Sequence, residues 1–241
     1  MQEKKAQLWD KKSKTFPRYS KDLNEIQQKT FALLRRLGVE FEGKSLIDVG
    51  CGTGVWTLHL AQKAKSVFAL DASQGMLQIL QEDANTLNLN NIYFKNSSFE
   101  EFYSTNHDKF DFAFASMSPA LNKKADFEAF LALATKRVYL GWQEYRQSDF
   151  LAPIFKAFNA KQKCFNDEDM EQFLKEQNIN FTKEVFEEVR FNEKPRQIAI
   201  ENALWHLNMA GIEPNLKELE SLVKDEVIKE KVQSKIKVLV F

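Results

Sequence analysis

Short apolar runs alternate with segments of helical periodicity along the first part of the chain. The apolar runs predict strands at residues 44–49, 66–70, 91–95, 110–115 and 136–142. Apolar residues recur at helical spacing over residues 55–64, in the segment that Ser73 can cap, and near residues 124–135. Strands and helices that alternate so regularly predict an α/β fold with a mostly parallel, doubly wound sheet flanked by helices.

The two ends of the chain follow a different pattern. An aromatic and basic lead-in opens the chain and is followed by a helix over 22–37, after which Gly38 suits a C-terminal cap. After residue 142 the pattern predicts helices near 149–158 and after 166–167, a strand near 181–191, a charged helical stretch over about 195–232 and a last strand at 235–241. The charged stretch is too long for a hairpin turn, and we interpret it as a helical insertion near the C-terminus.

No repeat, low-complexity tract or clean boundary divides the chain. We therefore predict a single domain over residues 1–241, with a helical lead-in at 1–38, a core at 40–142 and a C-terminal part at 143–241. A chain of 241 residues is long enough to bury a full core without disulfides or metals.

Charge and cysteine content narrow the classes of function. Lys plus Arg and Asp plus Glu both number 34, so the net positive field that concentrates proteins on nucleic acids is absent, and a nucleic-acid partner is disfavoured. Two cysteines exclude a disulfide framework and indicate a reducing compartment. The N-terminus is charged, and no segment approaches the roughly 18 apolar residues of a membrane span. We expect a cytoplasmic protein with no membrane partner.

A glycine-rich turn separates the first predicted strand of the core from the helix that follows. Residues 48–54 read Asp-Val-Gly-Cys-Gly-Thr-Gly, and alternate glycines remove Cβ atoms on one side of the turn, so that a flat ligand can approach the backbone. Asp71 ends the next strand, 21 residues after Gly50. Because two carboxylate oxygens match the two hydroxyls of a ribose, the combination predicts an adenosine-type ligand.

The spacing of the glycines distinguishes two cofactor classes. A dinucleotide fingerprint, G-x-G-x-x-G, would require glycine at position 55, where this chain has Val55. The pattern here is G-x-G-x-G, which disfavours a nicotinamide-dependent oxidoreductase.

With this motif and Asp71, roughly residues 40–142 resemble the class I S-adenosylmethionine-dependent methyltransferases. The resemblance implies a Rossmann-like class I methyltransferase fold and S-adenosyl-L-methionine as the cofactor. It further implies that the glycine loop contacts the amino acid part and ribose of the cofactor, that Asp48 supports the loop, and that Asp71 holds the ribose hydroxyls. The cofactor-binding residues predicted in this way are Asp48, Gly50, Cys51, Gly52, Thr53, Gly54, Asp71, Ala72, Ser73, Met76, Ser98, Phe99 and Ser116.

Two stretches depart from patterns of that family. Members often carry an Asp after the third strand that accepts a hydrogen bond from the adenine amino group. The matching residues 96–99 of this chain read Asn-Ser-Ser-Phe, so the Ser98 hydroxyl or the Phe99 backbone would have to replace that Asp. Residues 116–119 read Ser-Met-Ser-Pro. At this place, nitrogen methyltransferases of nucleic acids or protein amides carry a motif that resembles Asn/Asp-Pro-Pro-aromatic. Base or glutamine methylation is therefore disfavoured, although the hydroxyls of Ser116 and Ser118 could still bond a ligand or serve turn chemistry.

Few reactive side chains stand out. Cys51 lies inside the glycine loop and Cys164 in a Phe-flanked segment, and we reject both as catalysts. The three histidines, His59, His107 and His206, lack the paired spacing of a metal site, so no metal is predicted. No catalytic residue is predicted, because methyl transfer to a neutral nucleophile needs alignment and exclusion of water rather than an obligatory acid or base.

The leading hypothesis is a methyltransferase that acts on a small-molecule acceptor. The alternatives are methylation of RNA or protein and a non-catalytic cofactor-binding scaffold, since a fold alone does not prove activity. The lead-in aromatics, among them Trp9, Phe16 and Tyr19, either cover core or close over the cofactor. The acceptor, the oligomeric state and the role of residues 195–232 are not predicted.

Overall fold

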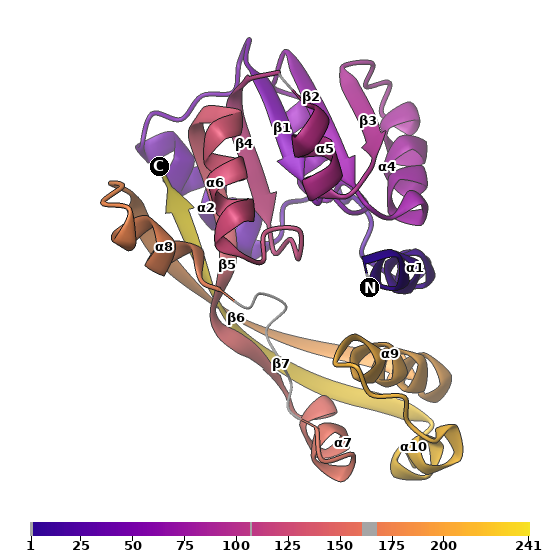
Figure 1. The fold of residues 1–241 in the computed structure, drawn as a ribbon. Helices are drawn as coiled ribbons and strands as arrows, with labels where there is room; N and C mark the ends of the chain where they lie inside the picture. Colours follow the sequence, from indigo (N-terminus) through magenta and orange to yellow (C-terminus); the bar gives the residue numbers. More distant parts are fainter. Residues whose placement is uncertain (1, 107, 161–167) are drawn as a thin grey trace. The chain divides into compact units, whose positions relative to one another are not determined.

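A seven-stranded sheet in the order β3-β2-β1-β4-β5-β7-β6 organises the chain (Figure 1). The computed structural model describes residues 2–106, 108–160 and 168–241. The strands are β1 Ser45–Val49, β2 Ser66–Asp71, β3 Ile92–Asn96, β4 Phe110–Ser116, β5 Ala134–Ser148, β6 Thr182–Pro195 and β7 Val227–Val240. The helices are α1 Gln2–Ser13, α2 Glu25–Arg36, α3 Thr57–Ala61, α4 Gln74–Thr86, α5 Phe99–Thr105, α6 Lys124–Leu133, α7 Leu151–Ala157, α8 Met170–Glu176, α9 Arg196–Met209 and α10 Leu216–Leu222.

The chain forms two compact units. Unit 1 contains Met1–Gly141, Phe165–Phe186 and Lys237–Phe241, and unit 2 contains Trp142–Cys164 and Glu187–Ile236. The longest strands, β5, β6 and β7, each contribute residues to both units. The prediction of a single functional domain over residues 1–241 stays a prediction.

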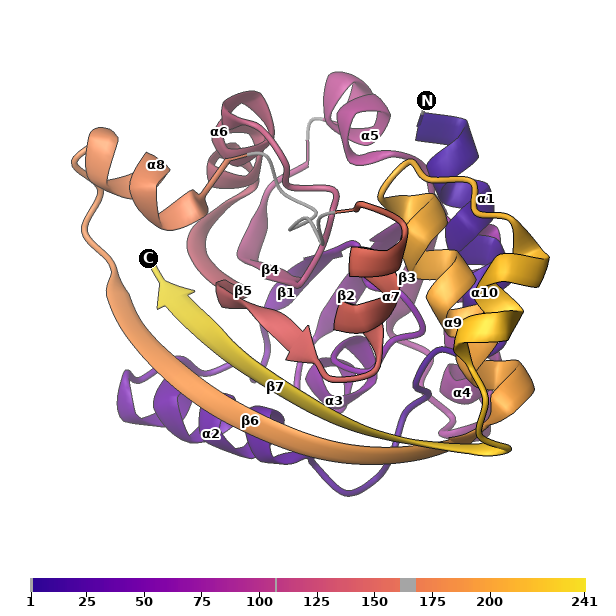
Figure 2. The same cartoon turned by 90° about the horizontal axis from the view of Figure 1, so that it is seen from below.

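Parallel strand pairs form the centre of unit 1. β1 pairs with β2 and with β4, β2 pairs with β3, and β4 pairs with β5, all in parallel register. From β1 the chain adds β2 and β3 on one side of β1, and then returns to add β4 and β5 on the other side. Because each crossover is right-handed, this change of direction requires helices on both faces of the sheet. Figure 2 shows α5 and α6 on one side of these strands and α2 and α3 on the other. The predicted mostly parallel, doubly wound α/β sheet is confirmed.

The core of unit 1 is rich in phenylalanine. Phe127 and Phe130 of α6 are fully buried, and Phe173 of α8 packs against Phe127 with ring centroids 5.4 Å apart. Strand residues such as Ile47 and Ala113 are also fully buried, as expected for a parallel sheet that is covered on both faces.

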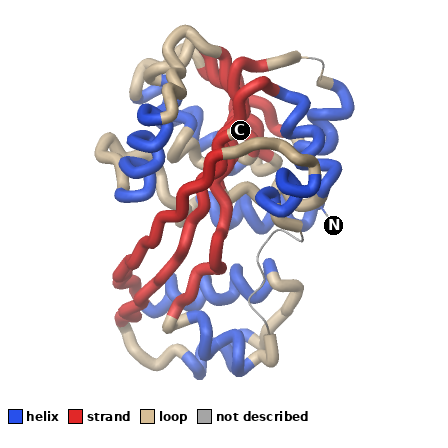
Figure 3. Tube along the Cα trace, turned by 90° about the vertical axis from the view of Figure 1, so that its left-hand side faces the viewer, coloured by secondary structure: helices blue, strands red, loops and turns tan. Residues whose placement is uncertain are grey.

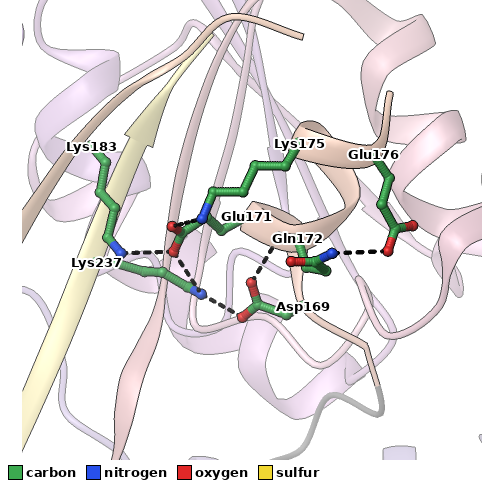
Figure 4. A network of polar contacts seen from close by, with 7 residues as sticks. All are labelled: Asp169, Glu171, Gln172, Lys175, Glu176, Lys183 and Lys237. Atoms are coloured by element: carbon green, nitrogen blue, oxygen red, sulfur yellow. Dashed lines mark hydrogen bonds and ion pairs between the residues drawn. The ribbon is translucent and has the colours of Figure 1, made fainter. Parts of the chain in front are cut away.

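A network of charges attaches α8 to the strands beside it (Figure 4). Glu171 accepts hydrogen bonds from the ammonium groups of Lys175 and Lys183, both at 2.8 Å. Lys237 of β7 is 4% exposed; it forms an ion pair with Asp169 and lies 3.6 Å from Glu171. Burial alone would raise the pKa of Glu171, but the hydrogen bonds from Lys175 and Lys183 and the charges of Lys183 and Lys237 lower it to about 2.

Unit 2 has its own hydrophobic cluster. α7, α9 and α10 supply most of it, with Ile154, Ile200 and Leu219 among the buried residues, and Ile228 of β7 completes it. Figure 3 shows these helices beside the ends of the three long strands. The sequence-predicted insertion between the last two strands therefore exists as α9 and α10.

Several predicted boundaries were wrong. The charged stretch is helical only as far as Leu222, and β7 begins at Val227 rather than at residue 235. In the first half of β7, buried residues such as Ile228 and Val232 alternate with exposed ones. This period of two was hard to recognise in the sequence, because lysines are frequent in this segment. The helix predicted over 55–64 is the short α3.

Two helices were not predicted individually, although α1 falls within the predicted helical lead-in at 1–38. α1 consists mainly of good helix formers but lacks an apolar stripe, so periodicity gave no signal. α5 begins at Phe99, in a stretch for which no helix was predicted, and Ser98 is its N-cap. In the part of the chain that the structure describes, no helix combines the length and hydropathy that crossing a bilayer requires.

Candidate functional site

The glycine loop between β1 and α3 lies at the carboxyl edge of the parallel strands. Gly50, Gly52 and Gly54 have φ of 73°, 56° and 82°, a left-handed conformation that favours glycine. The backbone N–H groups of Gly50 and Cys51 both donate to the carbonyl oxygen of Leu70, at 2.8 and 3.1 Å. These bonds tie the loop to the end of β2, next to Asp71.

The three glycines have different neighbours. A Cβ atom at Gly50 would lie 1.9 Å from Oγ of Ser118, and one at Gly54 would lie 2.0 Å from Cδ1 of Leu80. At Gly52 the nearest atom to such a Cβ is in the Phe16 ring, at 4.0 Å. The protein's own side chains therefore use the space beside Gly50 and Gly54, and Gly52 keeps the open side that a ligand can approach.

Asp71 bridges the glycine loop and the start of α4. Its Oδ2 accepts the backbone N–H of Gly52 and its Oδ1 accepts that of Ser73, both at 2.8 Å. Burial raises the pKa of this carboxyl, while the two backbone donors oppose the shift. Each oxygen retains a lone pair after these bonds, so the side chain can still accept two hydroxyl groups.

Asp48 lies in β1, two residues before Gly50, and is 2% exposed. The Thr57 hydroxyl donates to its Oδ2 at 2.7 Å. Burial raises the pKa of Asp48 to about 7, the Thr57 bond lowers it, and the charge of Asp71 raises it further. That Asp48 supports the loop stays a prediction, and Thr57 of α3 is a partner that sequence reasoning missed.

Cys51 and Thr53 complete the loop. Burial, with the charges of Asp71 and Asp48, raises the pKa of the Cys51 thiol, which keeps it in the less nucleophilic protonated form. The fully buried Thr53 hydroxyl donates to the carbonyl oxygen of Pro17 at 2.5 Å.

The predicted cofactor-binding residues outside the glycine loop include several at the ends of β2 and β3. Ala72 is exposed, whereas Ser73 and Met76 are buried at the first turn of α4. Asp71 faces Asn96 in the β2–β3 register, which places the stretch after β3 beside it. The other predicted residues there have structural roles as well: the Ser98 hydroxyl accepts the N–H of Glu101 at 3.2 Å, and Phe99 is 4% exposed.

The turn after β4 is adjacent to the glycine loop. Ser116 ends β4 and is partly buried, and Met117 takes the left-handed φ of 52°, which is uncommon for a residue with a side chain. Ser118 then packs against Gly50 and is 2% exposed. The structure therefore brings Ser116 and the glycine loop to the same edge, although 66 residues separate Ser116 from Gly50.

The N-terminal lead-in contacts this edge, through a residue that sequence reasoning missed. Oδ1 of Asp10 in α1 accepts the Ser73 hydroxyl at 2.6 Å and the Gly75 N–H at 2.9 Å. Phe16 packs edge-on against Trp9, with centroids 5.9 Å apart. The only local signal was the helix propensity of α1, which does not indicate what the helix contacts.

His59 and His206 are the two histidines that the structure describes. Burial lowers the pKa of His59, whose ring lies 4.8 Å from that of Tyr19. His206 belongs to unit 2, and His107 and Cys164 lie outside the described residues. Among the residues that the structure describes, no group of three or more His, Cys, Asp or Glu side chains has a metal-binding arrangement.

Comparisons with known proteins agree with this arrangement. Residues 46–138 match the family described as "Methyltransferase domain". An uncharacterised protein of Haemophilus influenzae is 32% identical over 112 residues, and a demethylmenaquinone methyltransferase of Geobacillus stearothermophilus is 35% identical over 63 residues. The two matches cover 45% and 25% of this chain, and 40% and 26% of those proteins. The chain thus spans less than half the length of the curated relatives it matches.

Among solved structures, precorrin 8w decarboxylase of Methanobacterium thermoautotrophicum superimposes with a TM-score of 0.52 at 13% identity, over 93% of this chain and 95% of that one. At this identity the similarity concerns the fold alone. The match over residues 46–138 supports the predicted resemblance to the class I S-adenosylmethionine-dependent methyltransferases for this part of the chain. The predicted cofactor, S-adenosylmethionine, agrees with this match.

Proposed function

We propose that this protein transfers a methyl group from S-adenosylmethionine to a small-molecule acceptor by in-line displacement. The observation that carries the proposal is the contact between Asp71 and Gly52, which holds the carboxylate at the open side of the glycine loop. Bound there, S-adenosylmethionine would supply an activated methyl group. The protein's own contribution is to hold the ribose hydroxyls at Asp71 and to position the loop by means of Asp48.

The remaining predicted residues would complete the site from neighbouring elements. Met76 would offer an apolar, polarisable surface to the adenine, with Ala72 and Ser73 next to it. The Ser98 hydroxyl or the Phe99 backbone would have to replace the usual acidic partner of the adenine, and Ser116 would reach the site from the end of β4. Cys51 and Thr53 would contribute backbone groups, since the Thr53 hydroxyl is bonded to Pro17.

A small-molecule acceptor is supported by two observations. The chain carries no net charge, so it lacks the electrostatic attraction that nucleic-acid substrates use. One of its relatives is a methyltransferase whose name gives demethylmenaquinone, a small molecule, as its substrate. The particular acceptor is not part of the proposal.

Binding of S-adenosylmethionine, measured by calorimetry and by the melting temperature, tests the cofactor site. We expect the ligand to raise the melting temperature of the protein, and NAD to leave it unchanged. Asp71→Ala should weaken binding by roughly 30-fold or more, because two hydrogen bonds to a charged acceptor contribute about 2 kcal/mol or more together. Asp111→Asn is a matched control, since Asp111 is an exposed acid that accepts the Ser45 N–H at 2.8 Å, away from the glycine loop.

The outcomes separate the hypotheses. No response of the unaltered protein to S-adenosylmethionine would overturn the cofactor site. Binding of the cofactor without methylation of any small molecule in an extract, together with methylation of RNA or protein, would overturn the choice of acceptor. Binding without any transfer would favour a cofactor-binding scaffold.

A further inference from the structure

β6 is the last strand of the sheet, and β7 is its only neighbour among the strands that the structure describes (Figure 2). Two ion pairs of unit 2 show how these strands pair. Glu187 of β6 faces Lys235 of β7, and Glu193 faces Lys229, each at 3.6 Å. The β7 number falls by as much as the β6 number rises, so the two strands run antiparallel in one constant register.

The outer edge of β6 carries the backbone groups of alternate residues. Directly after β6, the same register pairs Arg196 with Glu226, whose carbonyl oxygen accepts the Arg196 N–H at 2.8 Å. In an antiparallel ladder the N–H and C=O of one residue point to the same side, and those of the next residue point to the other. Residues in step with Arg196 therefore address β7, and the residues between them point away from the sheet. In unit 2 these outward residues of the strand are Glu187, Val189, Phe191 and Glu193, followed by Pro195.

The middle of this outer edge is apolar and exposed. Phe191 is 77% exposed, more than any other large hydrophobic residue that the structure describes, and Val189 is 48% exposed. An edge strand is a template for pairing with another strand, and proteins commonly block it with charged residues, proline or a bulge. The two central outward positions carry no charge and no proline, and the register with β7 continues past them. This edge is therefore open to a further strand.

The charge pattern of β6 decides which twofold pairing with a second copy of the chain is compatible. Outward residues have to face outward residues, so a twofold axis passes through one residue, which then faces its own copy. Like charges directly opposite each other in an antiparallel pair are destabilising. Such contacts exclude most axis positions: Glu187, Glu188, Arg190 and Glu193 would face their own copies, and an axis at Asn192 would set Arg190 against Lys194.

Between residues 187 and 193, the two remaining axis positions are Val189 and Phe191. An axis at Val189 would set the Phe191 ring against the Glu187 carboxylate. An axis at Phe191 sets the two Phe191 rings opposite each other, and cross-strand aromatic pairs stabilise antiparallel strands. It also sets Glu188 of each copy against Lys194 of the other, and it uses residues 187–195 of unit 2 alone. Both charge and apolar surface are thus complementary with the axis at Phe191.

We propose that the outer edge of β6 in unit 2 binds a second copy of this chain, with the two β6 strands antiparallel about a twofold axis at Phe191. The outward N–H and C=O groups of residues 187–193 exchange hydrogen bonds with those of the second copy. This interaction surface goes beyond the proposed methyl transfer, on which it does not depend.

Sedimentation velocity of the full-length protein, from about 1 to 200 µM, tests this pairing. We expect a reversible monomer–dimer equilibrium with a Kd of roughly 10 µM, because the interface is small. Phe191→Lys sets two ammonium groups against each other in place of the two rings, so it should weaken dimerisation by about tenfold or more. Tyr93→Lys is the matched control, because Tyr93 is a 60% exposed aromatic residue of β3, at the other end of the sheet. It should change the Kd by less than about threefold.

Cysteine crosslinking tests the position of the axis. In Phe191→Cys the two thiols face each other, at a Cα separation of about 5.5 Å that a disulfide can span. In Val189→Cys four residues of strand separate the two thiols, roughly 13 Å. Oxidation with copper phenanthroline should therefore give covalent dimer of Phe191→Cys and little of Val189→Cys. The unaltered protein gives the background from its own cysteines.

A monomer at every concentration up to about 200 µM would overturn the proposal. A dimer that Phe191→Lys leaves intact would also overturn it, because that dimer would use a different surface, and so would equal weakening by Tyr93→Lys. Preferential crosslinking of Val189→Cys would refute the axis at Phe191. If Phe191→Lys does not fold, the two cysteine variants still provide the test, since Phe191→Cys without covalent dimer would contradict the pairing.

Discussion

Asp48→Asn should remove the part of the pH dependence of the free energy of unfolding that comes from residue 48. The folded protein holds the pKa of Asp48 at about 7, against an ordinary value of 3.8, mainly because the side chain is buried. Between these two values the folded state keeps a proton that the unfolded state releases. This contribution to the free energy of unfolding is therefore complete below pH 3.8 and is lost as the pH rises through 7.

The magnitude follows from the two pKa values. Between about pH 5 and pH 8, ionisation of Asp48 should remove about 2.5 kcal/mol of stability. Asparagine has nearly the same shape, can still accept the Thr57 hydroxyl bond and does not ionise. The variant should therefore gain about 2.5 kcal/mol relative to the unaltered protein over this range, roughly 5–10 °C in melting temperature for a chain of this size.

Urea denaturation of both proteins at half-unit steps from pH 5 to pH 8 measures this difference. All other titrating groups are shared, so subtraction of the two curves isolates residue 48. Thr57→Val provides a second check: without the hydroxyl that lowers the pKa of Asp48, the loss of stability should extend to higher pH. Parallel curves for the unaltered protein and Asp48→Asn would refute the conclusion that burial controls this carboxyl.

Two further predictions concern other parts of unit 1. Because the pKa of Glu171 is lowered from 4.5 to about 2, its contribution to stability exists above pH 4.5 and is lost as the pH falls towards 2. Glu171→Gln should accordingly cost about 3 kcal/mol at pH 7 and much less at pH 3, and equal losses by urea denaturation at both values would contradict this reasoning. Asp10→Ala removes the acceptor for the Ser73 hydroxyl and the Gly75 N–H, so amide hydrogen exchange in α1 should accelerate by roughly tenfold. Unchanged exchange in α1, with Asp22→Ala as control, would mean that these bonds do not hold the helix.

Local patterns were sufficient for the centre of the fold. The apolar runs that became β1, β2 and β4 are buried on both faces, so their composition alone marked them as strands of a covered parallel sheet. The glycine loop could also be predicted, because alternate glycines follow a predicted strand in the sequence. In the structure all three glycines adopt a positive φ. The first half of β7 was harder to predict, because Lys229 and Lys231 occupy two of its four exposed positions and lysine also suits helices.

The finer structure of the site depends on contacts between distant residues. Spacing placed Asp71 near the loop, but it could not show that the carboxylate bonds to Gly52 and Ser73. Nor could it show that Ser118 fills the space beside Gly50, or that Asp10 accepts the Gly75 N–H in the first turn of α4. These contacts join segments that the chain brings together only after the sheet has formed, and no local periodicity encodes them.

The long strands limit how this protein can be divided or recombined. The unit boundaries at residues 141–142, 186–187 and 236–237 fall inside β5, β6 and β7. A shortened protein ending at any of these boundaries would expose the cut end of a hydrogen-bonded strand instead of a free loop. Grafting the second unit from a relative would succeed only where the donor matches three strand registers at once, so we expect the two units to be inherited together.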